Sequence, residues 1–318
     1  MSELEIQPER VLTAMVTPFK EDGRINPEGV AELSDYLMNH GSDGLVIAGT
    51  TGESPTIDID EHLGLFDEVR FSVPDAFIMA GTGSNYTDHA AEMTYNATER
   101  GSVNAILAVS PYYNRPSQEG IKHYYETLRR NTDLPIILYN IPVRTGRLVE
   151  LDTVRELFEA GAIDGVKDAT GNTEMAEELV DEFGEDIVIF SGDDSLNLDF
   201  ALAGADGSIS VMSHWAGEAM QEMYKALDAG DLDRAKQIQD ALSGSADYES
   251  VHTDTEGNFR DVPNPIPTKV MMSQILGRHV VGEAKPPMIA TAENRKYLEM
   301  RAPQVLAELA TAMSAIRA

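Results

Sequence analysis

Short apolar runs and longer amphipathic stretches alternate along the chain. The apolar runs are rich in β-branched residues, which is typical of buried parallel strands joined by crossover helices. Eight strands are predicted, at Val11 to Phe19, Gly44 to Ala48, Ala76 to Ala80, Asn104 to Val109, Pro135 to Tyr139, Ile163 to Lys167, Asp186 to Phe190 and Gly207 to Val211. Eight strand and helix units in series favour a closed α/β barrel, the (β/α)8 or TIM barrel, over an open doubly wound sheet, which the pattern alone leaves as an alternative.

Helix signals lie between these strands. Helix starts are predicted at Asn26, Ser117 and Thr173, and helix ends at Gly41, Gly101, Gly161 and Gly184. Beyond Ser213 only helical patterns remain, over residues 217–227, 232–242, 268–276 and 293–316. We therefore predict a barrel core over residues 1–216, followed over residues 217–318 by the last barrel helix and an appended C-terminal helical region. The polar, proline-containing stretch 247–267 predicts a long surface loop.

Composition narrows the function classes. The 318 residues are 42% apolar, which is sufficient for one large core. With 54 acidic and 24 basic residues the net charge is −30, so the surface repels nucleic-acid phosphates and anionic membranes. The absence of cysteine excludes disulfides, thiolate zinc sites and cysteine nucleophiles. The polar start, and the lack of an apolar run of roughly 18 residues, predict a soluble cytoplasmic protein that binds neither nucleic acid nor membrane.

Polar residues at strand ends are the candidates for chemistry, because TIM-barrel active sites lie at the carboxyl ends of the strands. Lys167 closes the sixth apolar run. If Val166 packs against helices, alternation turns Lys167 into the barrel, where burial should lower the pKa of its amine from about 10.4 and leave free amine to attack a ketone. Tyr139 ends the fifth run and offers a phenol for proton transfer. The alternatives are a lysine that reaches water at the strand mouth and a tyrosine that only packs in the core.

Two further segments carry candidate binding groups. The loop from Gly49 to Ser54 places Thr50 and Thr51 between glycines, which allows the backbone to bend into a nest of N–H groups that seats a carboxylate. A plain glycine-rich turn is the alternative. Arg144 follows Tyr139 closely, and a fixed guanidinium binds a carboxylate in bidentate fashion. By itself a single arginine is weak evidence, since a surface position is the default.

Other motifs do not support a cofactor. The segment from Gly81 to Tyr86 lacks the third glycine of a dinucleotide fingerprint, no P-loop occurs, and the seven histidines include no His-x-x-x-His pair. Asp193 and Asp194 are more typical of a turn or a helix cap than of a metal site. We therefore expect neither a metal ion nor an organic cofactor.

Taken together, these segments resemble the superfamily of dihydrodipicolinate synthase and N-acetylneuraminate lyase, and within it most closely the dihydrodipicolinate synthase family. The match extends from Val16 to Lys269. Its most specific motifs are GTTGES at Gly49 to Ser54, PYYNRPSQEG at Pro111 to Gly120, YNIPVRTG at Tyr139 to Gly146, VKDATGN at Val166 to Asn172 and SGDD at Ser191 to Asp194. Their order and spacing together argue against chance agreement.

The resemblance implies a class I aldolase in which Lys167 forms a Schiff base with pyruvate, and the enamine then attacks aspartate semialdehyde. It assigns a proton relay to Tyr139, Thr50 and Tyr113, with the tyrosine at position 113 crossing from a neighbouring subunit of a homotetramer built from two tight dimers. The pyruvate carboxylate is assigned to Thr51 and the semialdehyde carboxylate to Arg144. Gly192 and Ile209 are the other implied substrate-binding residues.

The chain departs from the family pattern at Asp168, where many relatives have glutamate, and in the long loop before Pro263. Another aldolase of the superfamily, acting on a keto-deoxy sugar acid or on N-acetylneuraminate, would share the Schiff-base half of the site. Arg144 discriminates between the two, since its segment matches the synthase pattern. A catalytically inactive barrel kept as a scaffold would be expected to lose the lysine or the tyrosine, and the chain has both.

The net charge generates a prediction about salt. We expect a protein adapted to a salt-rich cytoplasm, as in a halophile, because a Debye length of about 3 Å at 1 M screens its self-repulsion. Dialysis from molar into millimolar salt should then unfold the chain, as measured by circular dichroism. A fold that is equally stable at both salt concentrations would contradict this expectation.

Overall fold

The computed structural model describes residues 10–249 and 262–318. Its strands are β1 (Val11–Ala14), β2 (Gly44–Ile47), β3 (Phe77–Gly81), β4 (Ala105–Val109), β5 (Ile136–Asn140), β6 (Gly165–Asp168), β7 (Val188–Ser191) and β8 (Gly207–Ser210). They form a closed barrel in the order β1 to β8, with parallel pairing between successive strands from β3 to β8. The predicted TIM barrel is therefore confirmed, and the open sheet is wrong.

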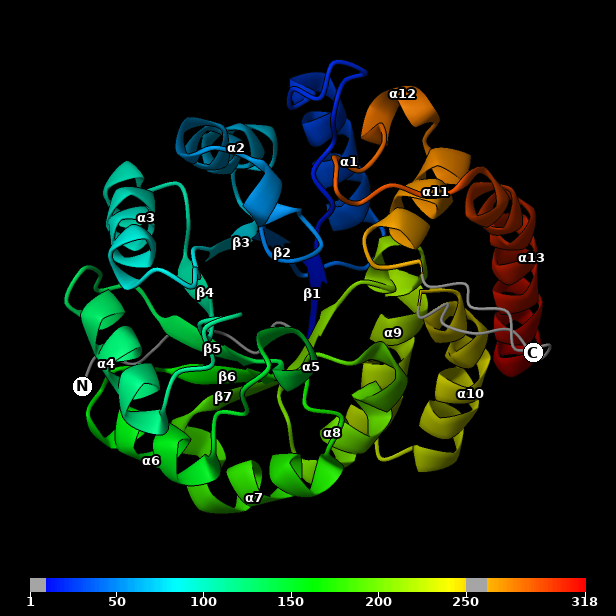
Figure 1. The fold of residues 1–318 in the computed structure, drawn as a ribbon. Helices are drawn as coiled ribbons and strands as arrows, with labels where there is room; N and C mark the ends of the chain where they lie inside the picture. Colours follow the sequence, from blue (N-terminus) through cyan, green and yellow to red (C-terminus); the bar gives the residue numbers. More distant parts are fainter. Residues whose placement is uncertain (1–9, 250–261) are drawn as a thin grey trace. The chain divides into compact units, whose positions relative to one another are not determined.

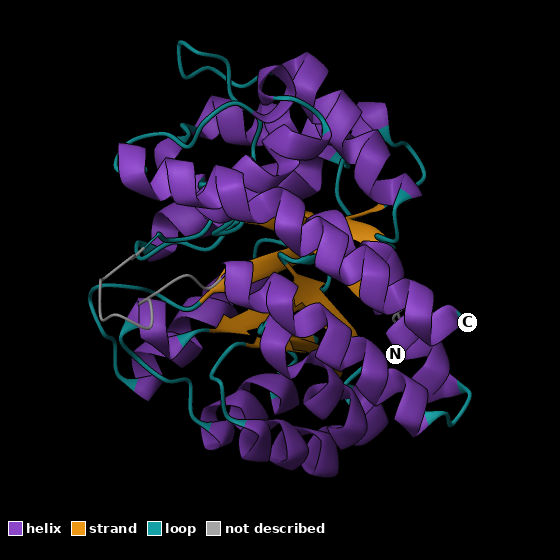
Figure 2. Ribbon diagram, turned by 90° about the vertical axis from the view of Figure 1, so that its right-hand side faces the viewer, coloured by secondary structure: helices purple, strands orange, loops and turns teal. Residues whose placement is uncertain are grey.

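Helices follow the strands in alternation, and most of the described chain outside the strands is helical (Figure 2). The helices are α1 (Pro27–Asn39), α2 (Ile59–Ser72), α3 (Thr87–Arg100), α4 (Gln118–Arg129), α5 (Pro142–Thr145), α6 (Leu151–Glu159), α7 (Thr173–Phe183), α8 (Asn197–Ala203), α9 (Ser213–Asp228), α10 (Leu232–Glu249), α11 (Ile266–Ile275), α12 (Arg278–Val281) and α13 (Ala292–Arg317). Single 3-10 turns lie at η1 (Ser54–Thr56), η2 (Gly184–Asp186) and η3 (Asp194–Leu196).

The described residues divide into two compact units, one formed by residues 10–12 and 77–210 and the other by residues 13–76, 211–249 and 262–318. In the first unit, register pairs such as Val109 with Tyr139 and Tyr139 with Lys167 align the ends of neighbouring strands. Helices α3, α4 and α6 pack in sequence, as do α7 and α8. The sequence predicted a boundary after residue 216, between a barrel core and a C-terminal helical region. The two compact units divide the chain in another way, so the predicted boundary stays a prediction.

The second unit holds β2, helices α1 and α2, and all helices from α9 onward. Helix α10 packs against α9 and α13, and α11 against α12 and α13, as the right-hand part of Figure 1 shows. Tyr248, Val270, Met271, Leu298 and Val305 belong to the apolar cluster that holds α10, α11 and α13 together. The appended helical region predicted from the sequence is present and has its own core.

Several predicted bounds differ from the structure. The first strand ends at Ala14 and not at Phe19, because the Val16 amide donates to Nε2 of His214, and Phe19 makes only an isolated bridge to Ile25. Helix α10 continues to Glu249 and so takes the start of the predicted loop, and residues 250–261 of that loop lie outside the described residues. Helix α12 was missed, since four residues carry too little periodicity.

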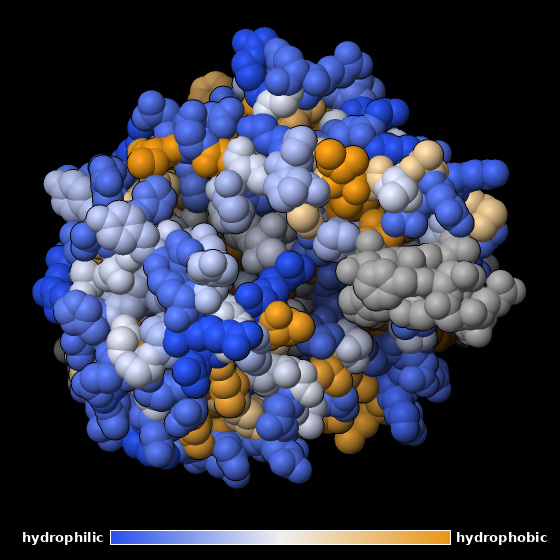
Figure 3. Space-filling view, viewed as in Figure 1, coloured by the Kyte–Doolittle hydropathy of each residue, from blue (hydrophilic) through white to orange (hydrophobic). Residues whose placement is uncertain are grey.

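Hydrophilic side chains predominate on the face seen in Figure 3, and apolar side chains appear there only as separate patches. This agrees with a net charge of −30 distributed over the molecular surface. The interior is apolar, with Tyr124, Tyr125, Phe66, Phe190 and Phe200 among the largest fully buried side chains. Burial of such side chains is the dominant favourable contribution to the free energy of folding.

Candidate active site

Lys167 and Tyr139 lie side by side at the ends of β6 and β5. The two residues are register partners, and the Lys167 Nζ atom lies 4.4 Å from the centroid of the Tyr139 ring. Both side chains are buried, with exposed fractions of 5% for Lys167 and 7% for Tyr139. An amine over the face of an aromatic ring receives a favourable electrostatic interaction when it is protonated. The structure therefore joins the predicted nucleophile to the predicted proton-transfer group.

Gly192 leaves room for the lysine. Its amide donates to the Asp168 carbonyl at 2.7 Å, which fixes the start of the loop after β7 against the end of β6. A β-carbon at position 192 would lie 2.9 Å from Cε of Lys167 and 2.8 Å from Cβ of Ala169. Only glycine fits without displacing one of these neighbours, so the absent side chain helps to set the position of the amine.

Asp168, the residue that departs from the family pattern, is fully buried beside Lys167. Its Oδ1 atom accepts a 2.7 Å hydrogen bond from the Thr170 amide, and Oδ2 has no hydrogen-bond partner within the described residues. Burial raises the pKa of the Asp168 carboxyl, and the hydrogen bonds from Thr170 oppose that shift. The carboxyl stabilises the turn after β6, and its aspartate length suits that contact.

Asn140 shapes the loop that carries Arg144, and our reading of the sequence missed it. Its Nδ2 atom donates to the Val149 carbonyl at 2.9 Å, and its Oδ1 accepts from the Val149 amide at 3.1 Å. Its own carbonyl accepts from Ala169, which links the loops after β5 and β6. The signal in the sequence was an asparagine directly after the candidate tyrosine, and the structure shows that its side chain is fully buried.

Arg144 lies on the short helix α5, with its side chain exposed. Its guanidinium forms no ion pair or hydrogen bond with residues 10–249 or 262–318. The helix is capped by Gly146, which has a φ of 72°, and a β-carbon there would lie 2.7 Å from Nε of Arg115. A second arginine, unforeseen from the sequence, therefore packs against the loop of the first.

Tyr113 lies in the loop between β4 and α4, and 89% of its side chain is exposed. Its φ of 74° is unusual for a residue other than glycine. The next residue, Asn114, donates from Nδ2 to the Asn85 carbonyl at 2.9 Å, so the loop is tied down on one side. Tyr113 thus projects from an anchored loop, away from the core of its own unit.

Thr50 and Thr51 belong to the second unit, in the loop after β2. Thr51 is 3% exposed, and its hydroxyl accepts a 2.9 Å hydrogen bond from Nδ2 of Asn264. The Glu53 amide donates to the Thr50 carbonyl, and the Ser54 amide to the Gly49 carbonyl. Within the described residues, the amides of Thr50 and Thr51 donate to no backbone carbonyl, so they stay available for an anion.

The structure also places Ile209 and the acidic pair Asp193 and Asp194, the other residues singled out from the sequence. Ile209 lies in β8 and is 1% exposed. Asp193 caps η3 by accepting a hydrogen bond from the Ser195 amide, and Asp194 accepts one from the Asn197 side chain. The two residues thus take the turn and cap positions that the sequence predicted. Across the described residues, no group of three or more His, Asp or Glu side chains is arranged for a metal ion. None of the helices described there has the length and apolarity needed to cross a membrane.

A second buried lysine deserves comparison with the first. Lys269, on α11, is 3% exposed, and its Nζ lies 2.7 Å from Oε1 of Glu53. Burial lowers the pKa of Lys269 to about 8, while the Glu53 carboxylate opposes that shift. Judged by burial alone, Lys269 would be as good a candidate for the nucleophile as Lys167. The Lys269 Nζ atom faces a carboxylate, and the Lys167 Nζ atom faces the Tyr139 ring.

Comparison with known proteins agrees with this geometry. The Dihydrodipicolinate synthetase family matches residues 7–303. A 4-hydroxy-tetrahydrodipicolinate synthase of Moorella thermoacetica is 42% identical over 291 residues, covering 90% of this chain and 94% of the relative. One from Listeria innocua is 40% identical over 267 residues, covering 83% and 88%.

Solved structures give the same result. A dihydrodipicolinate synthase of Bacillus anthracis superposes with a TM-score of 0.85 at 35% identity, covering 94% of this chain and 97% of that one. The chloride-inhibited enzyme of Acinetobacter baumannii, complexed with pyruvate, superposes with a TM-score of 0.85 at 31% identity, covering 95% and 99%. The chain therefore belongs to the dihydrodipicolinate synthetase family, as an enzyme with 4-hydroxy-tetrahydrodipicolinate synthase activity and thus a lyase of the class I aldolase type.

Proposed function

We propose that the chain joins pyruvate to aspartate 4-semialdehyde through an imine on Lys167, as a step of lysine and diaminopimelate biosynthesis. The observation that carries the proposal is the burial of the Lys167 amine, 5% exposed, at the end of β6 and over the Tyr139 ring. A solved relative with a TM-score of 0.85 is a complex with pyruvate. The synthase names of the relatives favour this reaction over that of a sugar-acid aldolase or N-acetylneuraminate lyase.

The steps follow from amine and carbonyl chemistry. The Lys167 amine adds to the keto carbon of pyruvate, and the carbinolamine loses water to give an imine. Loss of a proton from the methyl carbon gives an enamine, whose carbon attacks the aldehyde carbon of the semialdehyde while the aldehyde oxygen takes a proton. The amino group of the semialdehyde then adds to the imine carbon and displaces Lys167, which closes the ring of 4-hydroxy-tetrahydrodipicolinate.

Tyr139, Thr50 and Tyr113 are the proposed proton relay. Each step above moves a proton between carbon, nitrogen and oxygen, and positioned hydroxyl groups accelerate such transfers. The position of the Tyr139 ring beside the Lys167 amine supports its role. The roles of Thr50 and Tyr113 rest on the resemblance of their motifs to those of the family.

The two substrates are anionic, and we propose a separate seat for each carboxylate. The hydroxyl of Thr51 and the open amides of its loop suit the pyruvate carboxylate. The exposed guanidinium of Arg144, which has no ion pair or hydrogen bond within the described residues, suits the semialdehyde carboxylate. Gly192 and Ile209 would line the substrate, and Gly192 does so by leaving space next to Lys167.

The proposed reaction needs neither a metal ion nor an organic cofactor. The protonated imine withdraws electrons from the neighbouring carbon, which is the task that an added electrophile would otherwise perform. Activity should therefore persist after treatment with a chelator.

We further propose a cytoplasmic homotetramer of two dimers, in a cell with high internal salt. The 89% exposure of Tyr113 on an anchored loop supports a partner subunit that receives it. The net charge of −30 supports the salt requirement. A monomer mass by analytical ultracentrifugation in molar salt would contradict the assembly.

Trapping with borohydride tests the nucleophile. Incubation with pyruvate and borohydride should add one reduced pyruvate unit per chain, because reduction fixes the imine as a stable amine. Peptide mapping should place the adduct on Lys167, and Lys167→Ala should abolish it. The decisive comparison is Lys269, the other buried amine, whose pKa is lowered to about 8. An adduct on Lys269, or none, would refute the assignment.

Replacement of Arg144 tests the second carboxylate seat. In Arg144→Ala the kcat/KM for aspartate semialdehyde should fall, while pyruvate trapping persists. The fall should correspond to a loss of about 1.5 to 3 kcal/mol, the scale for a hydrogen bond to a charged group. Arg147→Ala is the matched control, since Arg147 is also exposed in the same loop. Unchanged semialdehyde kinetics in Arg144→Ala would favour a role for this residue outside the site.

Replacement of Gly192 tests the space around the amine. In Gly192→Ala, adduct formation on Lys167 should slow by about tenfold or more, because an ångström of misplacement is costly at a reacting centre. A time course of intact mass in the presence of pyruvate and borohydride measures this. Gly64→Ala is the control, because a β-carbon there meets nothing within 4 Å. Equal trapping rates in the two variants would show that Gly192 does not position the lysine.

A further inference from the structure

The loop that carries Thr50 and Thr51 is held in an unfavourable backbone conformation at both ends. Ala48, before it, has a φ of 53°, and Glu53 has a φ of 58°. Residues other than glycine adopt this left-handed region rarely, and they persist there only where the surroundings hold them. A β-carbon at Gly52 would lie 2.9 Å from Cα of Ala48, so the two ends of the loop are in contact. Contacts outside the loop must therefore fix its shape.

The strongest of those contacts is an ion pair with the appended helical region. Glu53 is 2% exposed and Lys269 3%, and Lys269 Nζ lies 2.7 Å from Oε1 of Glu53. The other carboxylate oxygen, Oε2, accepts a 2.7 Å hydrogen bond from the Lys285 amide. Helix α11 and the segment after α12 thus hold Glu53 from two directions.

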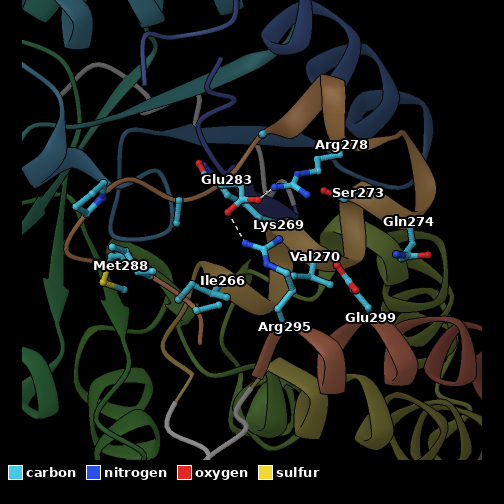
Figure 4. Close-up of a pocket in the computed structure, with 15 residues that line it drawn as sticks. Ile266, Lys269, Val270, Ser273, Gln274, Arg278, Glu283, Met288, Arg295 and Glu299 are labelled. Carbon is cyan, nitrogen blue, oxygen red and sulfur yellow. Dashed lines mark hydrogen bonds and ion pairs between the residues drawn. The ribbon is translucent and has the colours of Figure 1, made fainter. Parts of the chain in front are cut away.

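The partners of Glu53 are themselves fixed. Lys269 Nζ also donates to the Glu283 carbonyl at 3.0 Å, and the Glu283 carboxylate is ion-paired with Arg278 and Arg295. Figure 4 shows these groups on the wall of a cavity of about 340 Å³, with both arginines directed at Glu283. The ammonium groups of Lys269 and Lys285 lie 4.2 and 4.7 Å from the centroid of the Phe19 ring.

A second contact reaches the loop from the same region. Asn264, two residues before α11, donates from Nδ2 to the Thr51 hydroxyl at 2.9 Å. The N-terminal end of α11 therefore holds Thr51 directly, and its Lys269 holds the loop two residues further on at Glu53.

The energetics of buried ion pairs suggest a role other than stability. Removing two charges from water costs about as much as their attraction returns, so apolar residues of the same volume often replace such a pair without loss. We propose that the Glu53–Lys269 ion pair is a positioning device that sets the loop of Thr50 and Thr51 for pyruvate, so that the appended helical region controls pyruvate binding. This rests on the pyruvate-binding role of Thr51 given under the proposed function.

The test compares Glu53→Gln, Lys269→Met and the double variant Glu53→Gln/Lys269→Met. Each single variant leaves one charge buried without its partner and should unfold at a lower temperature, whereas the double variant should recover most of that loss. The pyruvate KM should nevertheless stay about tenfold raised in the double variant, because the loop is no longer held at Glu53. The semialdehyde KM should stay unchanged, a split that a general loss of stability would not produce.

Arg317→Met is the control, since it removes an ion pair of the appended helical region, with Glu222, that contacts neither the loop nor the partners of Glu53. Its pyruvate KM should equal that of the unmodified chain. A normal pyruvate KM in the folded double variant would overturn the proposal, as would equal rises in both KM values or an equal effect in Arg317→Met.

Calorimetric titration with pyruvate separates this inference from the assignment of Lys167. If borohydride places no adduct on any lysine but pyruvate affinity still falls in the double variant, the assignment of the nucleophile fails and the positioning role stands. An adduct on Lys269 would overturn both, because the double variant would then lack the nucleophile itself. If the adduct forms on Lys167 and pyruvate affinity is equal in both proteins, the positioning role fails by itself.

The pH profile supplies a second readout. Burial lowers the pKa of Lys269 to about 8, Glu53 opposes the shift, and Lys285 adds to it. Glu283 presents its carbonyl to Lys269 and its carboxylate to Arg278 and Arg295, and Glu61 faces Lys285. Above about pH 8 the Lys269 ammonium loses its proton and its attraction to Glu53, so the pyruvate KM of the unmodified chain should rise relative to that of the double variant. Parallel profiles in the two proteins would count against the proposal.

Discussion

The cost of removing an ammonium group from water governs both candidate lysines of this protein. An isolated buried charge costs several kcal/mol, so each lysine requires a local solution. Lys167 lies over the Tyr139 ring, a partner that interacts with an ammonium yet leaves a neutral amine chemically available. Lys269 faces the Glu53 carboxylate, a partner that binds only the ammonium. The same cost thus accompanies the candidate nucleophile in one unit and the proposed anchor of the threonine loop in the other.

Missing side chains matter as much as the charged ones. Gly192 lets the loop after β7 lie against Lys167, and Gly52 lets the threonine loop close on Ala48. At Gly146 the absent β-carbon admits the Arg115 side chain to the loop of Arg144. At Gly192 and Gly146 the backbone approaches a neighbouring side chain, and at Gly52 it approaches the backbone of Ala48, more closely than any larger residue would allow. Within each unit, glycine thus permits a close approach that hydrogen bonds or ion pairs alone would not.

Local patterns were sufficient to predict the barrel, because each buried strand is an apolar run and each helix has its own start and stop residues. They also placed Lys167 and Tyr139 near the ends of their strands, as the structure has them, while the catalytic roles of the two residues stay predictions. They failed where a partner distant in the chain decides the structure. The end of β1 depends on His214, and the role of Asn140 depends on Val149. The ion pair of Glu53 with Lys269 joins two motifs whose contact no periodicity encodes.

The scarcity of lysine sharpens this interpretation. The chain has eight lysines and 54 acidic residues, so a lysine on its surface would have carboxylates nearby. An exposed ion pair of that kind contributes little to the free energy of folding. Yet Lys167 and Lys269 are almost fully buried, and the Lys285 side chain is 18% exposed next to Glu53 and Phe19. Arginine cannot replace these residues, because its guanidinium stays protonated and cannot act as a nucleophile. Its planar fork also needs more space than an ammonium does between Glu53, Phe19 and the Glu283 carbonyl. Lysine thus lies where the proposed roles call for a compact charge or a free amine.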